Sequence, residues 1–401
     1  MTTSPPPSAP ALEGLRVLDL SSHLSGPYCS MILGDLGADV IKVEHPEGGD
    51  SARGMPPFVN GQSAPFMTFN RNKRSLTLDL KQPAGLEISR RLAARADVFL
   101  ENFKPGTAER LGLGYRELAA SNPRLIYCSI SGFGQTGPYR DRGGFDLIAQ
   151  GMSGLMSITG EEDGPPLRVP LPISDLCGGM FGAIGILAAV AARERTGRGQ
   201  WVDTSLLETP IALSVYEAAQ YFATGEVPPR LGPGHRTSAP YQAFRTKDGW
   251  ITIGGAAQHF WPRLCGLLGL EDLARDARFA TNAERVKRRK ELAAILQERL
   301  ERETTASWLE RLEAEGIPAG PIYTYDQVFA DPHVRAREMV VEVEHAAAGA
   351  TRILGIPIKL SETRGAIRRP APLLAEHTAE ILAELGYTPQ DQERLKAARV
   401  I

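Results

Sequence analysis

The sequence has few cysteines and histidines, and neither residue type is clustered. The four cysteines are far apart and include no C-x-x-C pair: Cys29, Cys128, Cys177 and Cys265. This spacing excludes the usual zinc sites and disulfide frameworks. No two of the seven histidines form an H-x-x-H or H-E-x-x-H pattern, so we expect no metal site. Scattered thiols in a chain of this length suit a reducing compartment, which predicts a cytoplasmic protein.

An excess of charge of one sign is also missing. The chain has 45 Lys and Arg residues against 47 Asp and Glu residues, a formal net charge of −2. Because there is no long basic run, we expect no nucleic-acid partner. Residues 1–10, MTTSPPPSAP, lack the basic start and apolar core of a signal peptide. They predict a disordered tail.

One long uncharged run could suggest a membrane span. Residues 176–192 contain no charged side chain, which approaches the minimum length for a spanning helix. The run is short and rich in glycine, and charged residues flank it directly. We therefore interpret it as a buried helix packed closely on its neighbours, and we expect no membrane partner.

The order of the hydrophobic segments predicts an α/β fold. Residues 15–20 and 38–44 have strand patterns, and a helix beginning at Pro27 lies between them. Such a strand–helix–strand unit makes a parallel sheet the expected core. Further strands are expected at 97–100, 124–130 and 200–203, and further helices at 83–95, 176–196 and 206–222. Ligands usually bind at the carboxyl edge of such a sheet.

A change in composition at residues 227–234, VPPRLGPG, predicts a domain boundary. After it come a hairpin over residues 241–253 and charged amphipathic helices at 282–303 and 306–315. The first strand–helix turn has no G-x-G-x-x-G fingerprint, and there is no G-x-S-x-G elbow. Dinucleotide binding and serine hydrolysis are therefore not indicated.

Two segments could bind or react with ligands. Residues 70–75, NRNKRS, bring three cations together, which suits either a grip on phosphates or carboxylates or a solvated loop. Asp175 opens the glycine-rich helix, which we expect to begin at Leu176 with Ser174 or Asp175 as its N-cap. Its carboxylate would face the positive end of the helix dipole and remain ionised. Taken alone, these residues favour a simple cap over a catalytic acid.

Assembled in order, several segments resemble class III CoA-transferases, the CaiB–BaiF family. The resemblance runs from about residue 12 to the end of the chain. It is strongest to members that use succinyl-CoA or related dicarboxylyl-CoA donors. It rests on LEGLRVLD at 12–19, GDLGADVIKVE at 34–44, NRNKRS at 70–75, ENF at 101–103, GFGQTGP at 132–138, TGRGQ at 196–200 and PLL at 372–374.

The resemblance implies a mechanism and a set of site residues. Asp175 would be the covalent nucleophile, moving CoA from an acyl-CoA donor to a carboxylic acid acceptor. The loop at Gly234 and His235 would be a lid over the acid. Residues implied to contact CoA are Leu24, Ser25, His45, Leu78, Lys81, Asn102, Phe103, Lys104, Arg110, Phe145 and Asp146.

The resemblance also implies the architecture. Residues 1–225 and 331–401 would form a large Rossmann-like domain, residues 226–330 a smaller α/β domain, and two subunits an interlocked homodimer. One branch of the family has Gln and Arg where this chain has Leu24 and His45, and a run of glycines where it has Gly232-Pro233-Gly234. These differences argue against oxalate as the acceptor.

Two other functions are open. The same family contains α-methylacyl-CoA racemases, which need two proton-transfer groups flanking the substrate Cα. This chain has Phe145 and Ala257 at the corresponding positions, and neither side chain can carry a proton. A non-catalytic acyl-CoA-binding protein is the second alternative, against which Asp175 and the glycines that follow it argue.

Overall fold

The computed structural model describes residues 9–401, so most of the expected tail, residues 1–8, lies outside the described part. The chain forms two compact units. The larger contains the described residues up to Leu155 together with Arg168–Ala218 and Pro332–Ile401; the smaller contains Met156–Leu167 and Ala219–Asp331. Both ends of the described part of the chain, residues 9–401, thus lie in the larger unit.

The segment Met156–Leu167 was not expected in the smaller unit. It is held there by contacts with residues far along the chain. Arg230 donates hydrogen bonds to the carbonyl oxygens of Glu161 and Gly164 at 3.1 and 2.7 Å. Lys290 pairs with Glu162 at 2.6 Å. Sequence reasoning missed the segment because these partners are separated from it by more than sixty residues.

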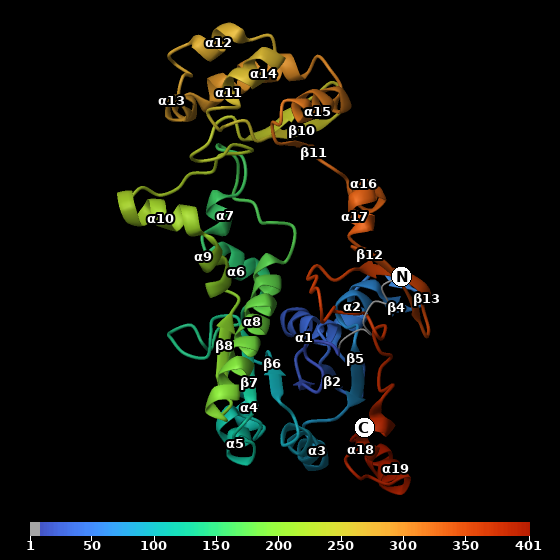
Figure 1. The fold of residues 1–401 in the computed structure, drawn as a ribbon. Helices are drawn as coiled ribbons and strands as arrows, with labels where there is room; N and C mark the ends of the chain where they lie inside the picture. The colour runs from blue at the N-terminus through green and yellow to red at the C-terminus, as the bar shows by residue number, and fades with distance from the viewer. Residues whose placement is uncertain (1–8) are drawn as a thin grey trace. The chain divides into compact units, whose positions relative to one another are not determined.

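A six-stranded sheet forms the centre of the larger unit (Figure 1), with strand order β5-β2-β1-β6-β7-β8. Every neighbouring pair is parallel. The carboxyl ends of all six strands therefore meet at one edge, which we call the carboxyl edge. The strands are β1 (Arg16–Asp19), β2 (Asp39–Glu44), β5 (Lys73–Thr77), β6 (Val98–Glu101), β7 (Ile126–Ser131) and β8 (Trp201–Ser205).

One face of the sheet is covered by α1 (Ser25–Asp35) and α8 (Ile173–Thr196), whose buried residues join one hydrophobic cluster with those of the strands. Glycines on α8 allow a close approach. A Cβ at Gly179 would lie 2.7 Å from the carbonyl oxygen of Ser25, and one at Gly185 would lie 2.5 Å from Val202. Larger side chains would push α8 away from α1 and β8.

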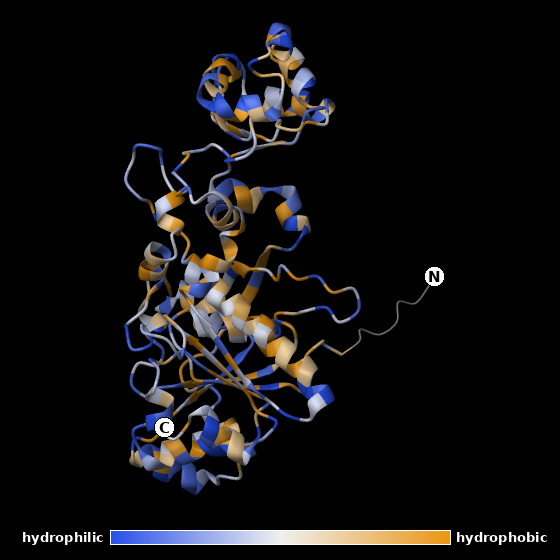
Figure 2. Ribbon diagram, turned by 90° about the vertical axis from the view of Figure 1, so that its left-hand side faces the viewer, coloured by the Kyte–Doolittle hydropathy of each residue, from blue (hydrophilic) through white to orange (hydrophobic). Residues whose placement is uncertain are grey.

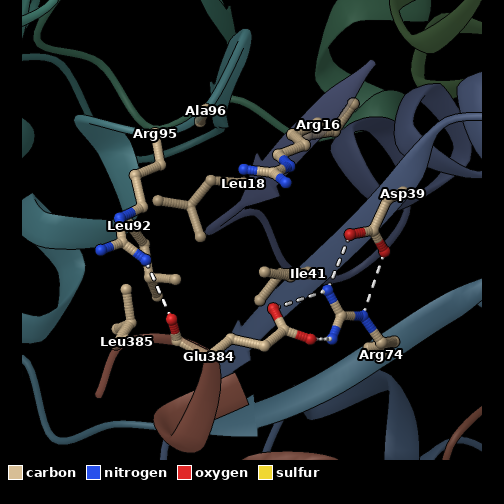
Figure 3. A pocket seen from close by; sticks show the side chains of 11 residues that line it. Arg16, Leu18, Asp39, Ile41, Arg74, Leu92, Arg95, Ala96, Glu384 and Leu385 are labelled. Atoms are coloured by element: carbon tan, nitrogen blue, oxygen red, sulfur yellow. Dashed lines mark hydrogen bonds and ion pairs between the residues drawn. The ribbon is translucent and has the colours of Figure 1, made fainter. Parts of the chain in front are cut away.

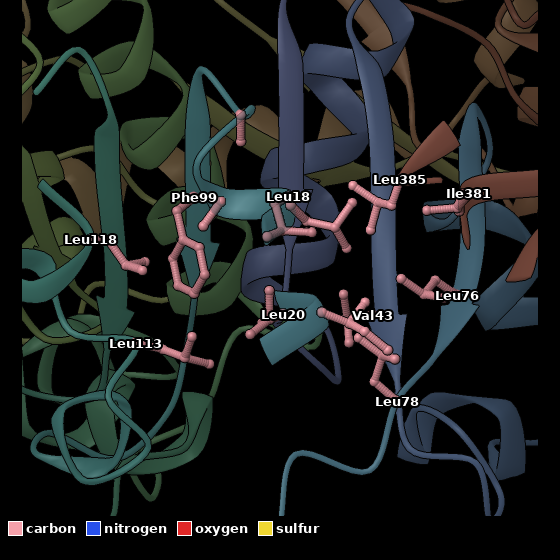
Figure 4. Close-up of a cluster of buried hydrophobic side chains, with 14 of the residues drawn as sticks. Leu18, Leu20, Val43, Leu76, Leu78, Phe99, Leu113, Leu118, Ile381 and Leu385 are labelled. Carbon is pink, nitrogen blue, oxygen red and sulfur yellow. The ribbon is translucent and has the colours of Figure 1, made fainter. Parts of the chain in front are cut away.

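The opposite face is covered by α3 (Pro83–Ala93), α5 (Tyr115–Ser121) and α18 (Thr378–Glu384). Leu18, Leu76 and Phe99 of the sheet pack against Ile88, Leu118 and Ile381 of these helices, as Figure 4 shows in part. Hydrophobic residues run along the strands at the centre of this unit (Figure 2). Helices on both faces make the fold a doubly wound, Rossmann-like α/β arrangement.

The basic segment 70–75 is neither a ligand-binding segment nor a solvated loop, the two possibilities that the sequence left open. It enters β5, where Arg71, Lys73 and Arg74 are 1 %, 0 % and 6 % exposed. Arg71 binds Asp35 with two hydrogen bonds, at 2.9 and 2.7 Å. Because buried charges need partners, these cations are used inside the fold and cannot grip a ligand.

Arg74 pairs with acids at the amino edge of the sheet (Figure 3). It contacts Asp39 at 2.7 Å and Glu384 at 2.6 Å, the two pairs that the figure draws, and also Glu380 at 2.8 Å. This edge carries a cavity of about 300 Å³ that Arg16 and Arg95 also line. Arg74 is thus already compensated by three carboxylates.

Several shorter elements connect these layers. The expected helix 206–222 is interrupted at Ser214, giving α9 (Glu208–Leu213) and α10 (Val215–Thr224). The C-terminal part adds the hairpin of β12 (Val340–His345) and β13 (Gly349–Leu354). The remaining elements are η1 (Ser51–Gly54), β3 (Phe58–Val59), β4 (Gln62–Ser63), α2 (Ala64–Phe69), α4 (Thr107–Arg110), α6 (Asp146–Met152), α7 (Leu155–Ile158), α17 (Pro332–Ala336) and α19 (Pro389–Ala397).

The smaller unit has an antiparallel sheet of order β11-β10-β9 with its own hydrophobic core, which includes Phe244, Trp261 and Trp308. Its strands are β9 (Gln242–Arg245), β10 (Trp250–Ile253) and β11 (Ala319–Pro321). The expected helix 282–303 is divided at Arg288. The helices are α11 (Trp261–Leu267), α12 (Glu271–Arg275), α13 (Asn282–Lys287), α14 (Arg289–Leu300), α15 (Thr305–Ala314) and α16 (Tyr325–Ala330).

Among the described residues one helix, α8, is long and apolar enough to cross a membrane by length and composition alone. Its contacts are those of a core helix. Its glycines face α1, β7 and β8. Near its end the buried side chain of Arg193 pairs with Asp97 at 2.9 Å. These contacts give its length a structural explanation within the larger unit.

Candidate functional site

Asp175 lies in the first turn of α8, where it is the third helical residue. The helix begins at Ile173 with Pro172 in the N-cap position. The expected start at Leu176, with Ser174 or Asp175 as the cap, is therefore wrong by one turn. Asp175 is therefore not the N-cap residue of α8. No hydrogen bond to the Asp175 carboxylate is found within residues 9–401.

The cap of α8 is supplied by Asp146, the first residue of α6. One of its carboxylate oxygens accepts a hydrogen bond from the backbone N–H of Ser174 at 2.8 Å. The other accepts from Gln150 Nε2, also at 2.8 Å. Gln150 is fully buried and also bonds the backbone of Val169 at 2.9 Å. Asp146 and Gln150 thus fix the chain that leads into α8.

The expectation that Asp175 is fully ionised is also wrong. Burial, together with the nearby negative charge of Asp146, raises the pKa of Asp175 to about 7. The favourable helix-dipole effect is of the order of 0.3–1 kcal/mol at such a position. Desolvation outweighs it here because no donor stabilises the carboxylate. At neutral pH the group is therefore divided between its charged and neutral forms.

The start of α1 lies beside the face of α8 that carries Asp175. Asp175 and Gly179 are four residues apart, so they share one face of the helix. Gly179 approaches the carbonyl oxygen of Ser25 so closely that a Cβ would lie 2.7 Å from it. The loop that joins β1 to α1 therefore lies near the acid. This places Asp175 beside the carboxyl edge of the sheet.

Most of the residues expected to contact CoA lie along that edge. His45 follows β2, Leu78 and Lys81 follow β5, and Asn102–Lys104 follow β6. Leu24 and Ser25 belong to the loop after β1 and the start of α1, and Arg110 ends α4. Backbone hydrogen bonds connect the strand ends, including one from the N–H of Leu78 to the carbonyl oxygen of Glu44 at 2.8 Å. The structure thus assembles residues from separate segments into one row.

Burial divides this row into two groups. Leu78 is 1 % exposed and Ser25 is 4 % exposed, so their side chains pack inside the fold and only their backbones can meet a ligand. Lys81, Lys104 and Arg110 are exposed. Within the described chain none of the three forms an ion pair; Arg110 only donates to the Thr107 hydroxyl at 2.8 Å. Free cations at this edge suit the phosphates of CoA.

Phe145 and the candidate lid occupy different parts of the molecule. Phe145 is the N-cap of α6 and is 69 % exposed. Gly234 and His235 belong to the smaller unit, where they line a cavity of about 630 Å³. The ring of His235 meets that of Tyr241 edge-on at 5.0 Å. Closure of this loop over Asp175 remains a prediction.

Sequence reasoning missed the buried groups behind the row. Lys42 of β2 is fully buried and contacts Asp50 at 2.8 Å. Lys73 contacts Asp19 at 3.4 Å, and both are fully buried. Nothing in the local sequence distinguishes these residues, because each partner lies in a different segment. Within residues 9–401 no group of three or more His, Cys, Asp or Glu side chains could hold a metal ion.

Comparisons with known proteins identify the family of this chain. Residues 12–378 match the family described as CoA-transferase family III. The chain is 43 % identical to mouse succinyl-CoA:glutarate CoA-transferase over 97 % of this chain and 90 % of that protein. It is 43 % identical to succinyl-CoA:mesaconate CoA-transferase of Haloarcula marismortui over 94 % of this chain and 96 % of that one.

A solved structure shows the same fold. The crystal structure of a CAIB/BAIF family protein from Brucella suis aligns with a TM-score of 0.84 and 42 % identity, covering 94 % of this chain and all of that one. Matches of this extent establish the family, and with it an acyl-CoA donor and a carboxylate acceptor. This chain belongs to CoA-transferase family III and is an acyl-CoA:carboxylate CoA-transferase.

Proposed function

We propose that the enzyme transfers CoA from a dicarboxylyl-CoA, with succinyl-CoA as the first candidate, to a carboxylic acid, and that Asp175 is its covalent nucleophile. One observation carries the assignment. Asp175 combines a position in the first turn of α8, a carboxylate with no hydrogen-bond partner among residues 9–401, and a pKa raised by burial to about 7. A carboxylate that no donor stabilises keeps its lone pairs available for attack.

The first half-reaction loads the enzyme. An Asp175 oxygen attacks the acyl carbon of the donor thioester, and the C–S bond breaks to give a mixed anhydride and the CoA thiolate. The thiolate then attacks the Asp175 carboxyl carbon. The anhydride bond breaks, which releases the donor's free acid and leaves an Asp175–CoA thioester. The energy of the thioester is conserved because water takes no part.

The second half-reaction uses the same steps in reverse. The acceptor carboxylate attacks the Asp175–CoA thioester and displaces the thiolate, giving a second anhydride. The thiolate then attacks the acceptor's acyl carbon, and Asp175 leaves as a free carboxylate. Burial favours this exchange because each step passes charge between oxygen and sulfur in a site shielded from water. Backbone N–H groups near the start of α1 are candidate donors to the tetrahedral oxyanions.

We further propose that CoA lies along the carboxyl edge. The free cations Lys81, Lys104 and Arg110 would bind its phosphates, and the backbone at Leu24 and Ser25 would meet its pantetheine end beside Asp175. The support is the common edge on which these segments end. In the smaller unit, the loop at His235 would cover the acyl group. Phe145 and Asp146, at the start of α6, would also contact the bound CoA.

The choice of acids rests on the relatives. Two of them are named for succinyl-CoA with glutarate or mesaconate. Both acceptors are dicarboxylates, so we propose a dicarboxylate acceptor for this enzyme.

We also propose an interlocked homodimer in the cytoplasm. The larger unit exposes Met180, Phe181 and Ile184 of α8, which are 40 %, 39 % and 60 % accessible. Beside them lies an apolar cavity of about 340 Å³. Apolar surface of this kind marks an interface between proteins. All four cysteines are free thiols and buried, which suits a reducing compartment.

The function is tested by a matrix of donors and acceptors. Succinyl-CoA, glutaryl-CoA and acetyl-CoA would each be combined with glutarate, mesaconate, succinate and oxalate, and the products followed by mass spectrometry. We expect turnover of succinyl-CoA with glutarate or mesaconate, and little with oxalate. Activity confined to acetyl-CoA as the donor would overturn the substrate proposal but not the family assignment.

A further inference from the structure

The loop between β1 and α1 is held by side chains from other elements at three consecutive residues. Lys42 donates to the carbonyl oxygen of Ser21 at 2.9 Å. Asn102 accepts from the N–H of Ser22 at 3.0 Å and donates to its carbonyl at 2.8 Å. Asp50 accepts from the N–H of His23 at 2.9 Å. We call residues 21–23 the anchored loop.

Two of these anchors form one buried ion pair. Lys42 Nζ lies 2.8 Å from Asp50 Oδ2, and both side chains are almost completely buried. Asp50 Oδ1 is shared between the N–H groups of His23 and Ala52, each at 2.9 Å. A removal of either charge would leave the other uncompensated in the interior. The pair therefore binds β2, the start of η1 and the anchored loop into one rigid group.

Electrostatics keep both partners charged. Burial opposes the positive charge of Lys42, but the carboxylates of Asp19 and Asp50 outweigh it and hold its pKa above the ordinary value. Burial likewise opposes the charge of Asp50, and Lys42 outweighs it, which lowers the pKa of Asp50. Both groups are thus ionised at neutral pH, and the pair does not switch with physiological pH.

The anchored loop has a conformation that it would not adopt freely. His23 has a φ of +71°, in the left-handed region that non-glycine residues rarely occupy. Such a conformation persists only where the surroundings over-determine it. Its N–H bond to Asp50 and the Nδ1 contact to the Ser51 hydroxyl at 3.2 Å supply that constraint. The turn at His23 directs the chain into Leu24 and the first turn of α1.

We propose that the Lys42–Asp50 pair positions the anchored loop for coenzyme binding. This inference rests on the proposed function, which places CoA against Leu24 and Ser25. Both residues directly follow the anchored loop. Neither Lys42 nor Asp50 touches the substrate, since both lie beneath the loop. They are positioning residues, and they act by fixing the backbone that the coenzyme meets.

The test uses a double variant that removes the pair without leaving a lone charge. Lys42→Met/Asp50→Asn keeps an amide oxygen that can still accept from His23, but it loses the Ser21 anchor and the ion pair. We expect faster hydrogen exchange in residues 20–26 and a KM for acyl-CoA raised about tenfold. The KM for the acceptor acid and the kcat should change by less than about threefold.

The matched control removes another buried ion pair from the same unit. Arg71→Met/Asp35→Asn breaks a contact of 2.7 Å whose side chains are 2 % and 4 % exposed, at the far end of α1. It should lower thermal stability to a similar degree while leaving the KM for acyl-CoA unchanged. Both variants would be compared at equal folded fractions, measured by circular dichroism.

The outcomes separate positioning from general stability. Equal changes of KM in the two double variants, or unchanged exchange at residues 20–26 in Lys42→Met/Asp50→Asn, would overturn the proposal. Failure of the wild type to form an Asp175–CoA adduct would instead refute the proposed function. The exchange measurement needs no substrate, so it reports on the anchored loop in either case.

Discussion

Asp146 caps the helix that carries Asp175 and at the same time opposes the charge of Asp175. The same carboxylate accepts from the Ser174 N–H at 2.8 Å and adds to the burial that raises the pKa of Asp175 to about 7. The cap fixes where the acid stands, and the repulsion keeps part of the population protonated. Asp146 thus helps to fix the position of Asp175 and adds to the effect of burial, which is the larger cause of its raised pKa.

Replacement of Asp175 by Ala or Asn should abolish CoA transfer, with a loss of about 10³-fold or more, as for other covalent nucleophiles. CoA binding should persist, because the carboxyl edge is untouched. Intact-mass spectra of the wild type with acyl-CoA alone should show a CoA adduct that maps to Asp175. Substantial turnover by Asp175→Ala would refute the assignment.

The pH profile of the first half-reaction should report the pKa of Asp175. Attack requires the carboxylate, so the rate of adduct formation should rise through about pH 7 and level off above it. In Asp146→Asn, the amide oxygen can still cap Ser174, but the repulsion is gone. The rise of the rate of adduct formation with pH should therefore occur at lower pH. Asp203→Asn, at another acid with a raised pKa on β8, is the control and should leave the rise in place.

Replacement of Asp175 by Asn should also stabilise the fold, increasingly so at higher pH. The folded pKa of about 7 lies above the ordinary value of 3.8. Between these values the folded state binds more protons than the unfolded state. The free energy of unfolding of the wild type therefore falls as the pH rises. We expect a gain in Tm of a few degrees at pH 8 and less at pH 5. An equal gain at both pH values would contradict the raised pKa.

Charge removal at Lys81, Lys104 and Arg110 should weaken CoA binding. Each change to Gln or Met should raise the KM for acyl-CoA severalfold, and the salt dependence of KM should become shallower as phosphate contacts are lost. Arg195→Gln serves as a control, because this exposed residue ends α8 at the opposite edge of the sheet. If all three variants bind CoA like the wild type, CoA does not lie along the carboxyl edge.

Racemisation of a 2-methylacyl-CoA should not occur. A proton must leave one face of Cα and another must arrive on the opposite face, and each step needs a group that holds a proton near neutral pH. Phe145 and Ala257 can hold none. Solvent deuterium should therefore not enter the α-position at a catalytic rate in a preparation that transfers CoA. Rapid exchange with inversion, without transfer to any acid, would reverse this reading.

The local pattern was enough where neighbouring residues decide the structure. The strand–helix–strand unit over residues 15–44 was predicted from hydrophobic order, because a buried parallel strand needs a continuous apolar run. The local pattern did not predict β5, because Lys73 and Arg74 suggested a surface segment. Their partners Asp19, Asp39 and Glu384 lie tens to hundreds of residues away. Only the folded chain can neutralise such charges and bury them.

By itself, the sequence determined the α/β class, five of the six strands of the larger unit's sheet and, through its assembled motifs, the family; it also singled out Asp175 as a candidate nucleophile. The tertiary structure decided where α8 begins, which of the residues implied to contact CoA have exposed side chains, and why the pKa of Asp175 is raised to about 7. The reason is physical. Hydrophobic order is encoded along the chain, whereas desolvation, capping by Asp146 and the anchoring of residues 21–23 by Lys42 and Asp50 exist only after distant segments have come together.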